Sequence, residues 1–138
     1  MHIILSALIA WAIAQGIKIL IAFAKTRKWD SQLLVASGGM PSSHTALVVA
    51  TSCRVGMLEG FDSNAFAICV VLSLIVMYDA VNVRRSVGVQ ARKLNQMLET
   101  FRESGHLDEE GVKEILGHTP LQVAGGFVIG LLVGLVEI

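Results

Sequence analysis

The sequence predicts an all-α integral membrane protein, a bundle of about four transmembrane helices with an additional cytoplasmic amphipathic helical segment. Hydrophobic residues make up 54% of the 138 residues and charged residues 16%, below the roughly 25% charged residues of soluble domains. The mean hydropathy is +0.66. The charges gather in short segments between long apolar stretches, which suits a bilayer better than water. We expect one domain, 1–138, and the net charge of zero does not indicate nucleic-acid binding.

Four apolar stretches are long enough, or nearly so, to cross a hydrocarbon core of about 30 Å. The first contains one charge, Lys18, and the third contains none before Asp79. Ala22-Phe23-Ala24 resembles a signal-peptide cleavage site, but no Lys or Arg precedes the apolar run, so a span is favoured over a cleaved signal. The expected spans are 3–24, 40–58, 64–83 and 121–137.

Glycines recur at every fourth position of the last span, at Gly126, Gly130 and Gly134. This spacing places small residues on one helix face, which lets a neighbouring helix approach closely. The pattern predicts a homo-oligomer held together through the last span. Simple tolerance of glycine in membrane helices is the alternative.

The basic residues indicate the orientation of the bundle. All of them except Lys18 and Arg54 follow the first span or lie between the third and fourth, whereas Glu59 and Asp62 mark the link between the second and third. The positive-inside rule then makes the basic side cytoplasmic, with both termini outside. We expect a bacterial inner (plasma) membrane location with the active face cytoplasmic.

A polar insert, 89–117, separates the third and fourth spans. It is expected to contain an amphipathic helix, then a break near Ser104 and a second short helix from Asp108 to Gly117. Its charged face is either solvated or rests on the membrane surface. The apolar residues at helical spacing are Leu94, Met97, Leu98 and Phe101.

The most informative stretch opens the second span, where two glycines precede Met40-Pro41-Ser42-Ser43-His44. Glycine permits unusual backbone dihedrals, and proline suits the start of a helix. The serines offer hydroxyls and amides at a helix N-terminus, where the helix dipole favours an anion. His44 can give or take a proton near neutral pH. A loop with serine caps is the alternative.

A second polar stretch closes the third span. Asp79 at membrane depth costs about 3 kcal/mol unless it is paired, and its partner is expected to be a nearby arginine or Lys18. Arg84 and Arg85 cannot share one helix face, so one of them is expected to point inward, where a guanidinium matches phosphate oxygens. These arginines could instead be a topological anchor.

A third polar stretch opens the last span with His118, just before Pro120. His118 and His44 are predicted at one depth and one membrane face, unless His118 faces the surface. We expect the two imidazoles to approach within about 8 Å across a polar pocket that includes a guanidinium. Lys18, about 10 Å inside its span, either serves an anionic head group or snorkels to the interface.

Together, these stretches resemble a divergent branch of the type 2 phosphatidic acid phosphatase/vanadium-dependent haloperoxidase superfamily, the acid phosphatase/vanadium-dependent haloperoxidase-related small membrane proteins. Pro41-Ser42-Ser43-His44 is similar to the superfamily's usual Pro-Ser-Gly-His. The preceding Gly-Gly-Met, the Asp-Ala-x-x-Val-Arg-Arg stretch that starts at Asp79 and the Gly-His-Thr-Pro around His118 are similar to the branch. The order and spacing of these motifs extend the resemblance over nearly the whole chain.

The resemblance implies hydrolysis of a phosphate ester through a phosphohistidine, without a metal or other cofactor, and with vanadate as an inhibitor or transition-state mimic. The substrate would be a phospholipid or isoprenoid phosphate, such as a lipid phosphate or prenyl pyrophosphate. His118 would be the nucleophile and His44 the general acid. The phosphate would be held by Ser42, Ser43, Lys18 and Arg84 or Arg85.

The chain departs from the superfamily pattern at several positions. Lys18 is not followed by Arg-Pro, and Ser43 replaces a glycine. Arg85 precedes His118 by 33 positions in place of the usual six, and Gln122 stands where an aspartate usually supports the nucleophile. Asp79 is a candidate substitute for that carboxylate. These departures leave a second hypothesis open, a non-catalytic membrane protein that binds anionic lipid head groups or assists a membrane complex.

Overall fold

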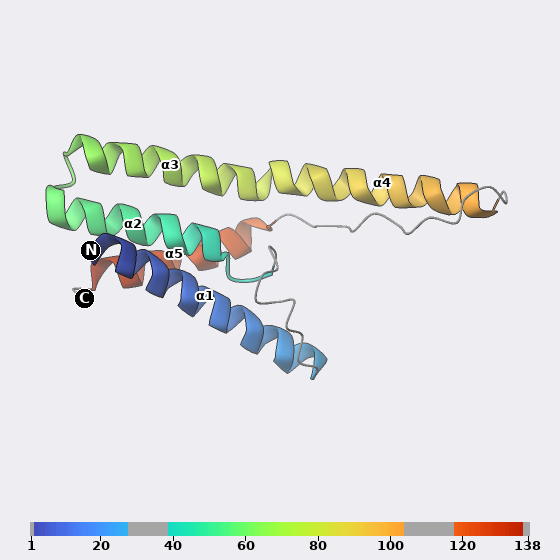
Figure 1. Cartoon of the computed structure of the whole chain (residues 1–138), viewed down its shortest axis with the longest axis horizontal. Coiled ribbons are helices and arrows are strands. Elements are labelled where there is room, and N and C mark those ends of the chain that lie inside the picture. The colour runs from blue at the N-terminus through green and yellow to red at the C-terminus, as the bar shows by residue number, and fades with distance from the viewer. Residues whose placement is uncertain (1, 28–38, 104–117, 137–138) are drawn as a thin grey trace.

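The protein is all-helical in the part of the chain that its computed structural model describes. That part comprises residues 2–27, 39–103 and 118–136, without the side chains of Thr26, Arg84 and Arg85. The all-α fold class is therefore confirmed. The helices, drawn in Figure 1, are α1 His2–Thr26, α2 Ser43–Glu59, α3 Asn64–Val81, α4 Val83–Glu103 and α5 Pro120–Leu135.

Helix α2 is at the centre of the bundle, where it contacts α1, α3 and α5. The helices alternate in direction, so the first turn of α2, the last turn of α3 and the first turn of α5 lie at one end (Figure 1). We call this the histidine end, because it holds His44 and His118. The opposite end contains the turn between α2 and α3 and the end of α5, and the first residues of α1 lie there too.

Length and hydropathy separate the outer helices from the central one. α1 and the helical stretch from Asn64 to Arg102 are long and apolar enough to cross a membrane, and α5 is apolar but shorter. α2 is less apolar because it faces other helices on most sides. Its polar residues Ser43, Thr45, Ser52 and Arg54 are all buried in the bundle.

Small residues allow α2 to pack closely against α1 and α5. The core is formed by Ala10 and Ala14 of α1 with Ala46 and Ala50 of α2. On α5, a Cβ added to Gly130 would lie 2.5 Å from the carbonyl oxygen of Ala46, closer than any side-chain carbon can approach.

The glycine face of α5 packs against α2 along its whole length. Cβ atoms added to Gly126 and Gly134 would collide with the backbone of α2, at Ser42 and Ala50. The predicted use of this face in a homo-oligomer is therefore wrong, since α2 of the same chain occupies it. The spacing identified a close helix contact but could not say which helix makes it.

The outer surface of the bundle is strongly apolar, as a membrane protein requires. Ile68 and Ile75 of α3 are 68% and 60% exposed, and Leu132 of α5 is 62% exposed. Contiguous apolar surface of this kind is rare on soluble monomers. It is the expected surface for helices that contact lipid, because lipid tails are as apolar as leucine.

A short turn at the opposite end makes α2 and α3 antiparallel. α2 ends at Gly60, whose φ of +97° favours glycine. Ser63 then caps α3 by accepting a hydrogen bond from the backbone N–H of Phe66 at 3.2 Å. Phe61 and Phe66 pack edge to face with ring centroids 5.1 Å apart, which holds the turn against the helices.

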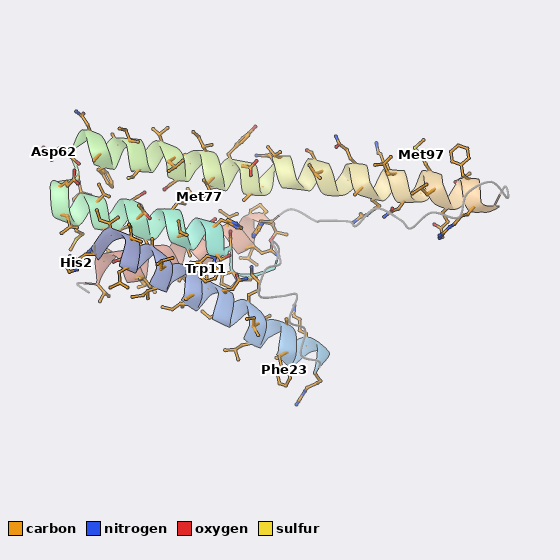
Figure 2. All side chains as sticks on the ribbon, viewed as in Figure 1. His2, Trp11, Phe23, Asp62, Met77 and Met97 are labelled. Carbon is orange, nitrogen blue, oxygen red and sulfur yellow. The ribbon has the colours of Figure 1, made fainter. Side chains whose placement is uncertain are left out.

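Helix α4 begins earlier than the expected insert helix. It starts at Val83, immediately after Asn82, and extends the direction of α3 away from the bundle (Figure 1). Asn82 donates from its backbone to Tyr78 and Asp79, so the helical course changes little there. Exposed apolar side chains such as Met97 project from α4 (Figure 2). The second short helix expected after Asp108 lies outside the described residues.

Candidate functional site

The first motif forms the N-terminus of α2. Ser42 is the N-cap residue, and its hydroxyl oxygen accepts hydrogen bonds from the backbone N–H of Thr45 at 3.4 Å and the Thr45 hydroxyl at 3.1 Å. Ser42 is fully buried and Ser43 is 2% exposed. Gly39 precedes them with a φ of +86°, a conformation that residues with a Cβ rarely adopt. Ser42 therefore caps α2, as the alternative interpretation of this motif expected.

The third motif forms the N-terminus of α5. Thr119 is the N-cap residue and Pro120 the first residue of the helix, as expected for a proline with a fixed φ. His118 lies just before this cap and is 2% exposed. It does not face the surface, so that alternative for His118 is wrong.

Backbone hydrogen bonds join the three motifs at the histidine end. The N–H of His118 donates to the carbonyl of Ala80, in the last turn of α3, at 3.0 Å. The N–H of Ser42 donates to the carbonyl of Gln122, in the first turn of α5, at 2.9 Å. Segments that are remote in the sequence are therefore fixed to one another by main-chain groups.

The two imidazoles lie close together as a result. The ring centroids of His44 and His118 are 6.4 Å apart, with an interplanar angle of 87°. The prediction of an approach within about 8 Å is confirmed. His118 is buried and His44 is half-buried, so His44 is the more accessible member of the pair.

Lys18 contacts the first motif from α1. Its side chain is 4% exposed and its ammonium donates to the Gln15 side-chain oxygen at 3.0 Å. A Cβ added to Gly39 would lie 3.4 Å from Lys18 Cγ, so the lysine stem packs against the glycine loop. Lys18 is covered by protein and does not snorkel to the interface.

The second motif is described only in part. Asp79 is half-buried in the last turn of α3 and directly precedes Ala80, the backbone acceptor of His118. Arg84 and Arg85 belong to the first turn of α4. Their side chains lie outside the described residues, as does the expected guanidinium of the pocket.

Gln122 takes part in the cap of α5. Its side-chain oxygen accepts from the backbone N–H of Thr119 at 2.9 Å, and its own N–H donates to the Thr119 hydroxyl at 3.4 Å. This reciprocal pair is a capping box. The signal, Thr followed three residues later by Gln, was present in the sequence and was missed. It gives a structural reason for glutamine at a position where the superfamily usually has aspartate.

The histidine end can in principle handle a phosphate anion. It combines a helix N-terminus, a buried ammonium and two imidazoles, which are groups that bind anions or transfer protons. Among the described residues, no three histidine, cysteine, aspartate or glutamate side chains are grouped so as to hold a metal ion.

Fold and site together define a helical membrane protein with a histidine pair at one end of the bundle. The chain belongs to the Divergent PAP2 family, whose sequence model matches residues 1–133. It is also similar to the uncharacterized membrane protein YuiD of Bacillus subtilis (strain 168), with 38% identity across 96% of this chain and 91% of that protein. No solved structure matches the chain. Membership of this family makes it a phosphatase-like membrane protein.

Proposed function

We propose that the protein is a metal-independent phosphatase that hydrolyses a lipid phosphate or prenyl pyrophosphate at the cytoplasmic face of a bacterial inner membrane. The observation that carries this proposal is the 6.4 Å separation of the His44 and His118 rings. Rings at this separation are close enough for both imidazoles to contact one phosphoryl group. The cluster of basic residues in the links at the histidine end supports a cytoplasmic site.

The reaction proceeds in two displacements. In the first, an imidazole nitrogen of His118 forms a bond to phosphorus as the bond from phosphorus to the leaving oxygen breaks, an ester bond in a lipid phosphate or an anhydride bond in a prenyl pyrophosphate, and His44 donates a proton to that oxygen. In the second, His44 takes a proton from water, the water oxygen attacks phosphorus and the phosphorus–nitrogen bond breaks. Inorganic phosphate leaves and both histidines return to their starting state. A histidine nucleophile divides the hydrolysis into two easier steps.

Phosphate binding is assigned to groups around the pair. Ser42 and Ser43 open α2, whose N-terminal amides and dipole favour a negative charge. Lys18 adds a cation from α1, and Arg84 or Arg85 adds a guanidinium from α4. Positive charge spread over the transferring phosphoryl group is the main requirement for catalysis of this kind.

Asp79 is assigned the role of supporting carboxylate. An imidazolium that forms on the nucleophile is stabilised by a nearby carboxylate, and the side chain of Gln122 is engaged in the cap of α5. Asp79 adjoins Ala80, the residue that accepts the His118 backbone hydrogen bond. It is therefore a carboxylate one residue away from the backbone acceptor of the nucleophile, although it is remote from His118 in the sequence.

The test is phosphate release by purified protein in detergent, from a lipid phosphate and from a prenyl pyrophosphate, with and without orthovanadate. We expect hydrolysis that vanadate inhibits. His118→Ala and His44→Ala should each lower kcat by about 10³-fold or more, because the residues act as a unit. His2→Ala, the same substitution at the opposite end, is the matched control. Full hydrolysis in both site variants would refute the proposal.

A second candidate is favoured by the capping role of Gln122, because a site without the usual aspartate could retain binding after losing catalysis. In that case the protein binds anionic lipid head groups, or assists a membrane complex, without turnover. Arg85→Ala should then weaken binding of anionic lipid, whereas no substrate releases phosphate. Phosphate release that depends on His118 would exclude this candidate.

A further inference from the structure

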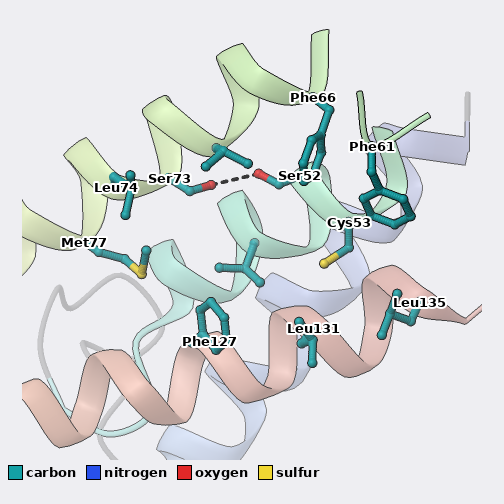
Figure 3. Close-up of a pocket in the computed structure, with 12 residues that line it drawn as sticks. Ser52, Cys53, Phe61, Phe66, Ser73, Leu74, Met77, Phe127, Leu131 and Leu135 are labelled. Carbon is teal, nitrogen blue, oxygen red and sulfur yellow. Dashed lines mark hydrogen bonds between the residues drawn. The ribbon is translucent and has the colours of Figure 1, made fainter. Parts of the chain in front are cut away.

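An apolar cleft of about 320 Å³ lies between α3 and α5, with α2 as its floor (Figure 3). Its volume is within the range of small-molecule sites. It is distinct from the histidine pair, and none of the phosphate-binding residues lines it. The walls are hydrocarbon and aromatic, from Phe61 and Phe66 at the opposite end to Met77 and Phe127 toward the histidine end.

The polar atoms in the cleft floor are turned toward one another. The hydroxyls of Ser52 and Ser73 are 2.8 Å apart, so one of them donates to the other, and both lie within hydrogen-bonding distance of the carbonyl of Val48, at 2.9 and 3.1 Å. Hydroxyls satisfied in this way offer little to a polar ligand. The cleft therefore suits an occupant made of hydrocarbon.

The cleft leads toward the histidine end along one face of α3. Phe66, Ser73 and Met77 line it, and the same face continues three residues later at Ala80, whose carbonyl holds His118. From Phe66 to Met77 the helix rises about 17 Å, and Ala80 is about 4.5 Å further. A chain lying in the cleft would thus end about one helical turn from the proposed phosphate site.

We propose that the cleft binds the hydrocarbon chain of the lipid whose phosphate group occupies the histidine end. The inference rests on the proposed function. It restricts the substrate of the proposed phosphatase to an amphiphile that places one hydrocarbon chain between α3 and α5. The surrounding medium is lipid, so the chain enters sideways from the bilayer. The cleft fixes the head group relative to His118 by holding the chain that follows it.

Two leucines of α3 provide a matched pair of variants. Leu74 lines the cleft, and Leu72 lies outside it on the opposite side of the helix, because positions two apart are about 200° apart. Their exposed fractions are similar, 58% and 51%. Tryptophan at position 74 fills the cleft, whereas tryptophan at position 72 projects into lipid.

The first measurement compares kcat/KM for a long-chain lipid phosphate with kcat/KM for a short-chain phosphate ester. We expect Leu74→Trp to lower the long-to-short ratio about tenfold, a typical effect of altered apolar contacts. Leu72→Trp should keep the parent ratio. Equal ratios in the two variants would overturn the inference while leaving the proposed hydrolysis intact.

The second measurement reports binding without turnover. In a background with both native tryptophans replaced by phenylalanine, the two variants are placed in bilayers containing a few mole per cent of a lipid phosphate with bromine on its chain. Fluorescence at position 74 should be quenched at least twofold more than at position 72, and the corresponding brominated alcohol should give less difference. The measurement is made separately with an acyl-chain lipid phosphate and with an isoprenoid phosphate, so that it shows which kind of chain the cleft binds.

The outcomes separate this inference from the proposed function. Selective quenching at position 74 without hydrolysis of any substrate would refute the phosphatase and retain the chain-binding cleft. Equal quenching at both positions would mean that bulk lipid fills the cleft and would overturn the inference.

Discussion

The histidine end of the bundle gathers buried polar side chains: Lys18 of α1, Ser43 of α2 and His118, whose backbone N–H donates to Ala80 in the last turn of α3. At the opposite end, α2 passes into α3 through a tight turn, and Arg54 donates to the carbonyl of Val136 at 3.2 Å. Both ends bury cations, since Lys18 and Arg54 are 4% and 6% exposed. The Arg54 cation caps the end of α5, whereas Lys18 lies against a glycine loop beside a histidine pair.

This difference shows which buried polar groups serve the fold. A guanidinium on a C-terminal carbonyl satisfies a helix end and also favours the helix dipole, so Arg54 has a sufficient structural role. Two imidazoles from remote segments are not required to end a helix. The close approach of His44 and His118 therefore indicates a chemical role for the histidine end, whereas Arg54 stabilises the opposite end.

After the histidine variants themselves, the largest expected effect compares substitutions of Asp79 and Gln122 at the histidine end. If Asp79 supports His118, Asp79→Asn should lower kcat about 10²-fold, as for the loss of a group that assists acid–base catalysis. Gln122→Ala should lower the free energy of unfolding by about 1 kcal/mol through the lost cap and change kcat far less. Single-turnover rates and thermal unfolding in detergent measure the two effects. If Gln122→Ala lowered kcat more than Asp79→Asn does, Gln122 and not Asp79 would be the residue that supports His118.

A second comparison uses the glycines of α5 at the two ends. Gly126→Ala and Gly134→Ala should each lower the free energy of unfolding by about 1–3 kcal/mol through overpacking. Gly126→Ala should also slow turnover of the folded protein, because the added methyl displaces the Ser42 carbonyl. Gly134→Ala, far from the histidines, should not.

Gly16 provides the control for the glycine variants. Nothing lies within 4 Å of a Cβ added there, so Gly16→Ala should stabilise α1 by about 0.5–1 kcal/mol. Thermal midpoints and kcat measured below them test all three variants. Equal loss of turnover in Gly126→Ala and Gly134→Ala would contradict the distinction between the two ends.

The smallest expected effect concerns the middle of the bundle, between the two ends. A double-mutant cycle on Ser52→Ala and Ser73→Ala should give a coupling energy of about 0.6 kcal/mol, the average for polar contacts between membrane helices. Thr51 bonds the carbonyl of Leu47 within its own helix at 2.9 Å, so Thr51→Ala should show no coupling to Ser73→Ala. Chemical or thermal unfolding of the four proteins measures the cycle. A coupling energy near zero for the serine pair would show that the contact between Ser52 and Ser73 does not stabilise the bundle.

The sequence predicted the helix bounds well where the length of an apolar stretch determines where a helix begins and ends. The observed bounds of α1, α2, α3 and α5 differ from the expected spans by at most three residues, except that the end of the last span lies outside the described residues. The meeting of His44 and His118 was also predictable, because alternating spans place the starts of two helices on one side. The depth of Lys18 left two roles open, head-group contact or snorkelling, and its burial at 4% exposed excludes the second.

Other features depended on information that the sequence pattern does not carry. A glycine face specifies a close neighbour without identifying it, and so α2 was missed as the partner of α5. The junction at Asn82 contains no proline, and helical propensity alone could not place the start of α4 at Val83. The cleft depends on how side chains of α3 and α5 separate above α2, which has no signature in periodicity.

The near-continuity of α3 and α4 through Asn82 has a mechanical consequence. α4 has 21 residues and is therefore about 32 Å long, a lever whose inner end adjoins the backbone acceptor of His118. A force that tilts the outer tip of α4 would move the Ala80 carbonyl and, with it, the imidazole that faces His44. The spacing of the two rings is thus mechanically linked to the outer tip of α4, one helix length away from the bundle.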